Sequence, residues 1–242
     1  MLFNIPQLGW DLELLKISPL NGDGFYDIPL KLQQSNYSIT LLRYWFIYHF
    51  LLAENANHEI LQIFEIGSDA GQQRDFINTA LRKGYPDVSL LVWDVPAERP
   101  ATNRSSADEN EERSELIKQS LGLKQAMSYD VIIVASVPGE AFFLEDIFAS
   151  LVKAVKKNGI LIGVSSPQRS RISKKPEPKI SVRLIKRLAS QYDLAVDFLS
   201  GGYFLRSKGL IPAQGKFRFR FNLLLGAFWP AKSAEIYWVL RK

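Results

Sequence analysis

The 242-residue sequence predicts an α/β fold around a mostly parallel sheet. One observation is an apolar run over residues 59–66, followed by a glycine turn and a helical stretch over 72–81. A second is that further apolar runs over 88–94, 129–136 and 160–165 alternate with helical patterns. Strands and helices that alternate in this way are typical of parallel strands joined by right-handed crossovers.

The first strand and its turn form the front half of a nucleotide-binding βαβ unit. Glu65 lies at the carboxyl end of the strand, where ligands bind in open α/β sheets. Gly67 and Gly71 let the backbone approach a ligand, and the N-terminus of the following helix offers unpaired N–H groups. The order Glu-x-Gly-x-x-x-Gly differs from the G-x-G-x-x-G fingerprint of dinucleotide sites.

The second predicted strand also ends in an acid. Asp94 lies 23 residues after Gly71. This spacing suits a carboxylate that accepts hydrogen bonds from the ribose hydroxyls of a nucleoside. An acid that ends a strand is also a common turn residue, so the glycine turn upstream strengthens the ligand interpretation.

The first 58 residues and the stretch 97–126 fit the α/β pattern least well. Residues 37–54 predict an aromatic-rich helix, interpreted either as core packing or as a cover for a substrate. Residues 97–126 read as an acidic insertion with a capping box at Ser106–Glu109, either a solvated surface or a mobile lid.

The second half of the chain predicts two helices, over 140–157 and 180–192, and two strands, over 194–199 and 234–241. Residues 216–221 alternate Lys or Arg with Phe. As a strand, this segment would place cations on one face and rings on the other. The alternatives to a ligand-contacting strand are a half-buried strand and the start of an amphipathic helix.

Composition excludes several classes of protein. There is no cysteine, which excludes disulfides, thiolate zinc sites and thiol catalysis. His49 and His58 are the only histidines and lack matched carboxylates, so we expect no metal site. No secretory signal and no membrane span is expected, which favours a cytoplasmic protein, with peripheral membrane association as an extension.

The charge is distributed unevenly. Residues 1–165 hold 14 Lys/Arg and 21 Asp/Glu, a net charge of −7, whereas residues 166–242 hold 16 and 4, a net charge of +12. A basic half of this kind favours an anionic partner, such as a phosphorylated substrate, a membrane surface or nucleic acid. An ordinary solvated face is the alternative.

Three segments carry a resemblance to one family. Residues 65–71, Glu-Ile-Gly-Ser-Asp-Ala-Gly, resemble motif I of the class I S-adenosylmethionine (SAM) methyltransferases, E-x-G-x-G-x-G, with Asp69 in place of the middle glycine. Residues 129–136 resemble motif IV, an aromatic–Asp pair before an apolar strand. Residues 151–165 resemble the family's helix, Lys-x-Gly turn and strand. The resemblance covers about residues 38–242.

This resemblance implies a Rossmann-like, seven-stranded, mostly parallel sheet with an antiparallel last strand and helices on both faces. It implies an N-terminal helical extension over 1–58 and a methyltransferase-like domain over 59–242. The implied cofactor is SAM, with Asp94 on its ribose, Val95 beside its adenine and Ser136 near its methyl group. The implied cofactor-binding residues are Glu65, Gly67, Ser68, Asp69, Gly71, Asp94, Val95 and Ser136.

The resemblance leaves the methyl acceptor open. No residue identifies itself as a catalytic base, and His49, Asp27 and Tyr203 are the candidates. The aromatic helix and the basic tail favour an anionic small molecule, a sugar or a lipid-linked glycan, with membrane-surface contact through residues 166–232. RNA is the next alternative, favoured by charge but without a recognisable RNA-binding module. A third is a non-catalytic relative, because Asp69 alters the glycine turn and the usual third strand is not visible.

Overall fold

The fold is taken from a computed structural model. It describes residues 43, 46, 47, 50, 51, 60–67, 89–96, 115, 118, 129–137, 141–165, 180–202, 216–233 and 235–242. Within these residues, no helix has both the length and the apolar character needed to cross a membrane.

Six strands form one sheet in the order β2-β1-β3-β4-β6-β5. Their bounds are β1 Ile60–Gly67, β2 Ser89–Pro96, β3 Tyr129–Val137, β4 Val155–Ser165, β5 Ala195–Gly202 and β6 Glu235–Arg241. Strands β2, β1, β3 and β4 pair in parallel, whereas β6 is antiparallel to both β4 and β5. The predicted α/β fold with an antiparallel last strand is therefore confirmed, and a seventh strand has no counterpart in the described part of the chain.

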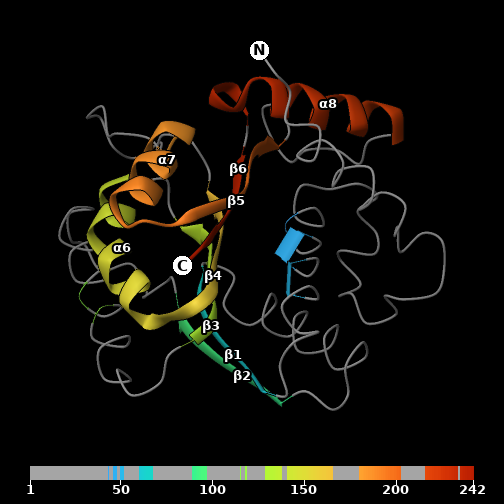
Figure 1. Ribbon diagram of the computed structural model, residues 1–242. Helices are drawn as coiled ribbons and strands as arrows, with labels where there is room; N and C mark the ends of the chain where they lie inside the picture. Colours follow the sequence, from blue (N-terminus) through green and yellow to red (C-terminus); the bar gives the residue numbers. More distant parts are fainter. Residues whose placement is uncertain are drawn as a thin grey trace, which may run out of the picture.

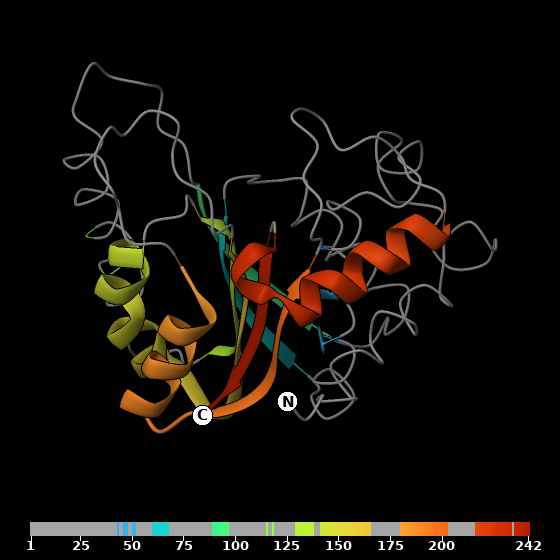
Figure 2. The same ribbon diagram turned by 90° about the horizontal axis from the view of Figure 1, so that it is seen from above.

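Helices lie on both faces of the sheet, as Figures 1 and 2 show. Their bounds are α6 Ala141–Ala154, α7 Val182–Gln191 and α8 Lys216–Phe228, with a 3-10 turn η2 at Pro230–Lys232. Helices α6 and α7 lie side by side on one face. The described residues between Arg43 and Leu51 are helical and lie on the opposite face.

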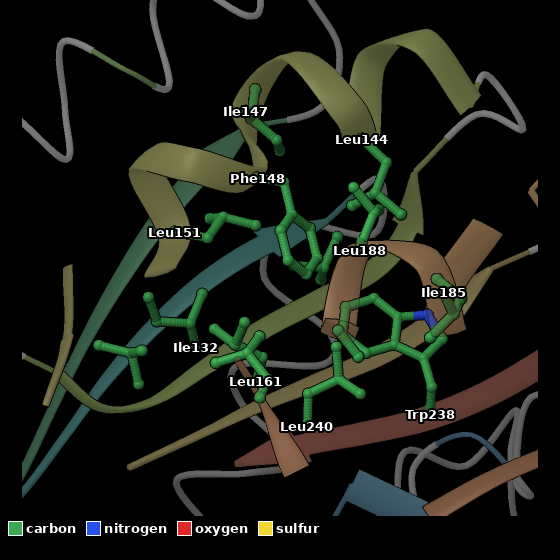
Figure 3. Close-up of a cluster of buried hydrophobic side chains, with 14 of the residues drawn as sticks. Ile132, Leu144, Ile147, Phe148, Leu151, Leu161, Ile185, Leu188, Trp238 and Leu240 are labelled. Atoms are coloured by element: carbon green, nitrogen blue, oxygen red, sulfur yellow. The ribbon is translucent and has the colours of Figure 1, made fainter. Parts of the chain in front are cut away.

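The main core lies between the sheet and the pair α6 and α7 (Figure 3). Phe148 and Leu151 of α6 and Leu188 of α7 belong to one buried cluster with the even-numbered residues of β6, among them Trp238. Strand residues point alternately to the two faces of a sheet. Both faces of β1 and β3 are covered, so successive residues are buried on one face or the other. For this reason the sequences of β1 and β3 are continuous apolar runs.

The second face is covered by the N-terminal helix. Phe46 is fully buried, and its ring centroid lies 5.3 Å from that of Phe198 in β5 and 5.0 Å from that of Tyr237 in β6. Ile47 and Leu51 are buried beside it. These residues support the core-packing interpretation of this helix. The residues whose helical spacing predicts this helix lie outside the described residues: Leu41, Leu42, Trp45, Tyr48, His49 and Leu52.

Two predicted boundaries in the second half of the chain are wrong. The helix predicted over 140–157 ends at Ala154, and β4 begins at Val155, not at Ile160. The reason is a tertiary contact: the Lys156 ammonium lies 2.8 Å from Asp130 Oδ1, while Asp130 Oδ2 accepts the Gln62 N–H at 2.9 Å. These bonds hold the segment beside β3, because a buried carboxylate must be paired.

The strand interpretation of residues 216–221 is also wrong, because these residues begin helix α8. Lys or Arg alternates with Phe at a period of two, which favours a strand. The structure is instead decided by packing of the residues that follow in the same helix. Asn222, Leu223 and Gly226 are buried at helical spacing. The strand predicted over 194–199 also runs further, because β5 ends at Gly202. A Cβ on Gly201 would lie 2.4 Å from the Gly226 carbonyl oxygen, so this glycine lets α8 approach the sheet.

Two buried tyrosines should respond in opposite ways to the loss of their hydroxyls. Tyr129 Oη is buried without a hydrogen-bond partner, and burial raises the pKa of this hydroxyl. Tyr237 Oη donates to Glu235 Oε2 at 2.6 Å. We expect Tyr129→Phe to stabilise the fold by about 1 kcal/mol and Tyr237→Phe to destabilise it by about 2 kcal/mol.

Urea unfolding of both variants at pH 7 tests this expectation. The unfolded Tyr129 hydroxyl ionises near pH 10, whereas the folded one resists ionisation, so the wild type should lose stability as pH rises above about 10. Tyr129→Phe should lose less over the same range. Equal losses from the two variants at pH 7 would contradict the assignment of their environments.

Candidate functional site

The carboxyl ends of the parallel strands meet at one edge of the sheet. Gly67 ends β1 and pairs with Pro96 of β2 on one side and Ala135 of β3 on the other. Val137 of β3 pairs with Ser165, which ends β4. Because parallel strands run in one direction, these residues lie along a single edge, which we call the carboxyl edge. Ligands of open α/β sheets bind outside this edge.

Glu65 lies two residues before the end of β1 and is 2% exposed. Phe64 and Ile66 on either side of it belong to the core under α6 and α7. Glu65 therefore faces the opposite side of the sheet. A carboxylate in a strand interior is costly unless it is hydrogen-bonded, so an acid here indicates more than packing.

The second predicted acid is paired in the sheet with the first. Asp94 of β2 pairs in register with Glu65, and Val95 pairs with Ile66. Neighbouring strands lie about 4.8 Å apart, so the two acids occupy adjacent positions at the same level of the sheet. The sheet thus brings together two acids that are 29 positions apart in the chain.

The remaining predicted site residues divide into two groups. Gly67 ends β1, and Ser136 is the penultimate residue of β3, so both lie at the carboxyl edge. Ser68, Asp69 and Gly71 lie outside the described residues. So do the three candidate bases, Asp27, His49 and Tyr203. The roles of all eight cofactor-binding residues remain predictions.

The structure places a further polar cluster at the carboxyl edge. Glu235 begins β6, is 2% exposed and pairs with Gly202 at the end of β5. Its Oε1 accepts from Arg43 Nε at 2.7 Å and also from an Arg43 terminal nitrogen, while Tyr237 Oη donates to Oε2. Ser233 Oγ donates to the Glu235 carbonyl oxygen at 2.7 Å.

This cluster, Arg43–Glu235–Tyr237, faces the same side of the sheet as Glu65. Ile236 and Trp238 point into the core under α6 and α7, so Glu235 and Tyr237 point away from it. Three strand spacings separate β1 from β6, about 14 Å. Glu65 and the Arg43–Glu235–Tyr237 cluster therefore lie at two separate positions along the carboxyl edge, on the face that the N-terminal helix covers.

Sequence reasoning missed this cluster because Arg43 and Glu235 are 192 positions apart. No local pattern joins them. One signal was available: Glu235 is the only acid between residues 198 and 242 and stands at the start of an apolar strand. An isolated acid in a basic segment, directly before a buried strand, favours a specific cationic partner.

No group of three or more His, Cys, Asp or Glu in the described part of the chain could hold a metal ion. The Lys118 pKa is raised by hydrogen bonds from its ammonium to Asp146 and Glu115, and both of these carboxylates are exposed to solvent.

No protein-family model matches this chain, and no curated protein matches it. Several solved structures are similar to it. The CurJ carbon methyltransferase has 15% identity and a TM-score of 0.47, over 98% of this chain and 67% of that one. The DszA carbon methyltransferase has 14% identity and a TM-score of 0.45, over 83% and 53%. The N-methyltransferase NodS of Bradyrhizobium japonicum has 13% identity and a TM-score of 0.36, over 81% and 94%.

The chain thus spans about half the length of the DszA carbon methyltransferase. All three of these structures are named as methyltransferases.

Proposed function

We propose that this chain is a SAM-dependent methyltransferase whose cofactor binds at the carboxyl edge. The observation that carries the proposal is the register of β1 and β2. It sets Glu65, buried beside Gly67, next to Asp94 at the edge where α/β sheets bind ligands. The antiparallel β6 between β4 and β5 adds support, since the motif resemblance implies this sheet.

The residues present fit this cofactor. SAM would supply an electrophilic methyl group on a sulfonium centre. Asp94 would accept hydrogen bonds from the ribose hydroxyls, and Val95 would lie against the adenine. Gly67 would leave room for the backbone turn 68–71 to approach the cofactor, and buried Glu65 would hold that turn.

Catalysis by such a site would depend on placement more than on acid–base groups. The protein would align the acceptor atom with the methyl group and exclude water, which supplies most of the acceleration in a transfer of this kind. Ser136, at the end of β3, would line the position of the methyl group. The acceptor we propose is an anionic small molecule, a sugar or a lipid-linked glycan.

Isothermal titration with SAM tests the cofactor assignment. The wild type should bind at micromolar levels, and Gly67→Val and Asp94→Ala should each weaken binding by tenfold or more, about 1.4 kcal/mol. Asp197→Ala is the matched control. Asp197 is also a strand acid, but it lies near the start of β5, away from the carboxyl edge, and pairs with Arg241.

The control should bind SAM as the wild type does. Failure of the wild type to bind SAM at millimolar concentration would overturn the proposal and favour a non-catalytic protein of this fold. Binding that survives in Gly67→Val and Asp94→Ala would place the cofactor elsewhere.

A further inference from the structure

Helix α8 presents an exposed apolar strip to solvent. Phe221, Leu224 and Phe228 are 48%, 38% and 36% exposed, and they recur at helical spacing on one side of the helix. Trp229 follows at 52% exposed, with its ring centroid 5.9 Å from that of Phe228. We call these four residues the α8 strip. Among the residues whose side-chain exposure the structure describes, Val196 is the only other exposed large apolar residue.

The strip cannot turn inward, because the other side of α8 is anchored. Asn222 and Leu223 are buried, at 0% and 1% exposed. The close approach of Gly226 to Gly201 fixes the helix against the end of β5. Figure 2 shows α8, in red, extending sideways from the sheet. The exposed strip is thus a fixed feature of the surface, and a contiguous group of exposed large apolar side chains indicates a binding surface.

The segment around the strip carries charge of one sign only. There is no acid between Asp197 and Glu235. The same segment contains six cations, Arg206, Lys208, Lys216, Arg218, Arg220 and Lys232. Three of these lie within the first five residues of α8, and Lys232 is exposed just after the strip. The complementary partner is therefore both apolar and anionic.

An anionic lipid surface meets both requirements. Interfacial helices combine Phe, Leu and Trp on one side with Lys and Arg nearby, and they bind through apolar burial together with attraction to anionic headgroups. A second copy of this chain is a poor partner, because a two-fold contact would bring two segments of charge +6 together. We propose that the α8 strip binds the surface of an anionic lipid bilayer.

The position of α8 gives this binding a consequence for the proposed function. Because α8 packs against the end of β5 at Gly201, it lies at the carboxyl edge, beside the start of β6. Membrane binding would bring the proposed cofactor site to the lipid surface. If the methyltransferase proposal holds, this placement favours a lipid or lipid-linked acceptor. The membrane contact itself does not depend on the cofactor.

Vesicle co-sedimentation of the full chain tests the proposal without any cofactor present. Wild type should bind phosphatidylcholine vesicles containing about 30% phosphatidylserine, bind pure phosphatidylcholine at least tenfold more weakly, and dissociate as salt rises from about 0.1 M to about 0.5 M. Phe221→Gln/Leu224→Gln should lower partitioning about tenfold or more. Arg218→Gln and Arg220→Gln should each lower it about fivefold.

Val196→Gln is the matched control, because Val196 is an equally exposed apolar residue, 42% exposed, near the start of β5. It should bind as the wild type does. Brominated phosphatidylcholine in the same vesicles should quench tryptophan fluorescence, and Trp229→Phe should remove that quenching. Titration with SAM in the absence of vesicles should give the same affinity for the strip variants and the wild type, which separates this test from that of the proposed function.

Three results would overturn the proposal. One is a wild type that binds no vesicles, or binds neutral vesicles as well as anionic ones. Another is binding of the Phe221→Gln/Leu224→Gln variant to anionic vesicles as strongly as the Val196→Gln control. The third is a wild-type dimer in sedimentation equilibrium that Phe221→Gln/Leu224→Gln converts to monomer, which would assign the strip to a second copy of the chain.

Discussion

Replacement of Glu235 by Ala should destabilise the fold by about 3 kcal/mol or more, because it removes one member of a buried ion pair. The Glu235 side chain is 3% exposed and that of Arg43 is 22% exposed. The substitution by Ala would remove the carboxylate that accepts hydrogen bonds from the Arg43 guanidinium and from the Tyr237 hydroxyl. It would also release the N-terminal helix from the start of β6.

Urea unfolding at pH 7 measures this loss, and two variants calibrate it. Glu235→Gln keeps the shape and an acceptor for Tyr237, so it should cost about half as much. Asp197→Ala breaks the partly exposed pair with Arg241, at side-chain exposures of 28% and 35%, and should cost less than about 1 kcal/mol. A loss for Glu235→Ala no larger than that for Asp197→Ala would show that the buried cluster does not hold the helix to the sheet.

Gly163→Val should destabilise the fold by about 3 kcal/mol or more through overpacking. Gly163 of β4 pairs with Trp238 of β6. A Cβ at residue 163 would lie 1.8 Å from Trp238 Cε2 and 2.0 Å from Cζ2. The indole is fully buried and donates to Ser165 Oγ at 3.2 Å, so it cannot move without loss of core packing and of this bond.

A double-mutant cycle with Trp238→Leu tests whether this contact is the cause. Trp238→Leu alone should cost about 3 kcal/mol, but Gly163→Val should cost much less in its presence, because the smaller side chain leaves room. The interaction free energy between the two changes should exceed about 1 kcal/mol. Additive losses would contradict the assigned contact.

Several strands of the sheet could be predicted from the sequence, because a buried strand appears there as a run of consecutive apolar residues. The apolar runs that form β1, β3 and the second half of β4 are continuous because both faces of these strands are covered. The predicted helices between the strands indicate crossover connections, and these give parallel pairing. The antiparallel β6 followed from the motif resemblance, not from periodicity.

The errors share a physical cause, which is contact between residues far apart in the chain. The early start of β4 depends on the bond from Lys156 to Asp130, and α8 is fixed by its packing on Gly201. The Arg43–Glu235 pair spans 192 positions. In the candidate site, the sequence could predict Glu65 and Asp94 separately, but only the register of the sheet makes them neighbours.

Hydrogen–deuterium exchange with and without SAM tests whether the proposed cofactor binds at the carboxyl edge. Protection should appear in peptides that contain residues 65–71, 94–96 and 135–139, and not at the opposite edge around Tyr129 and Gly159. Exchange unchanged by saturating SAM, or protection confined to that opposite edge, would contradict this placement of the cofactor.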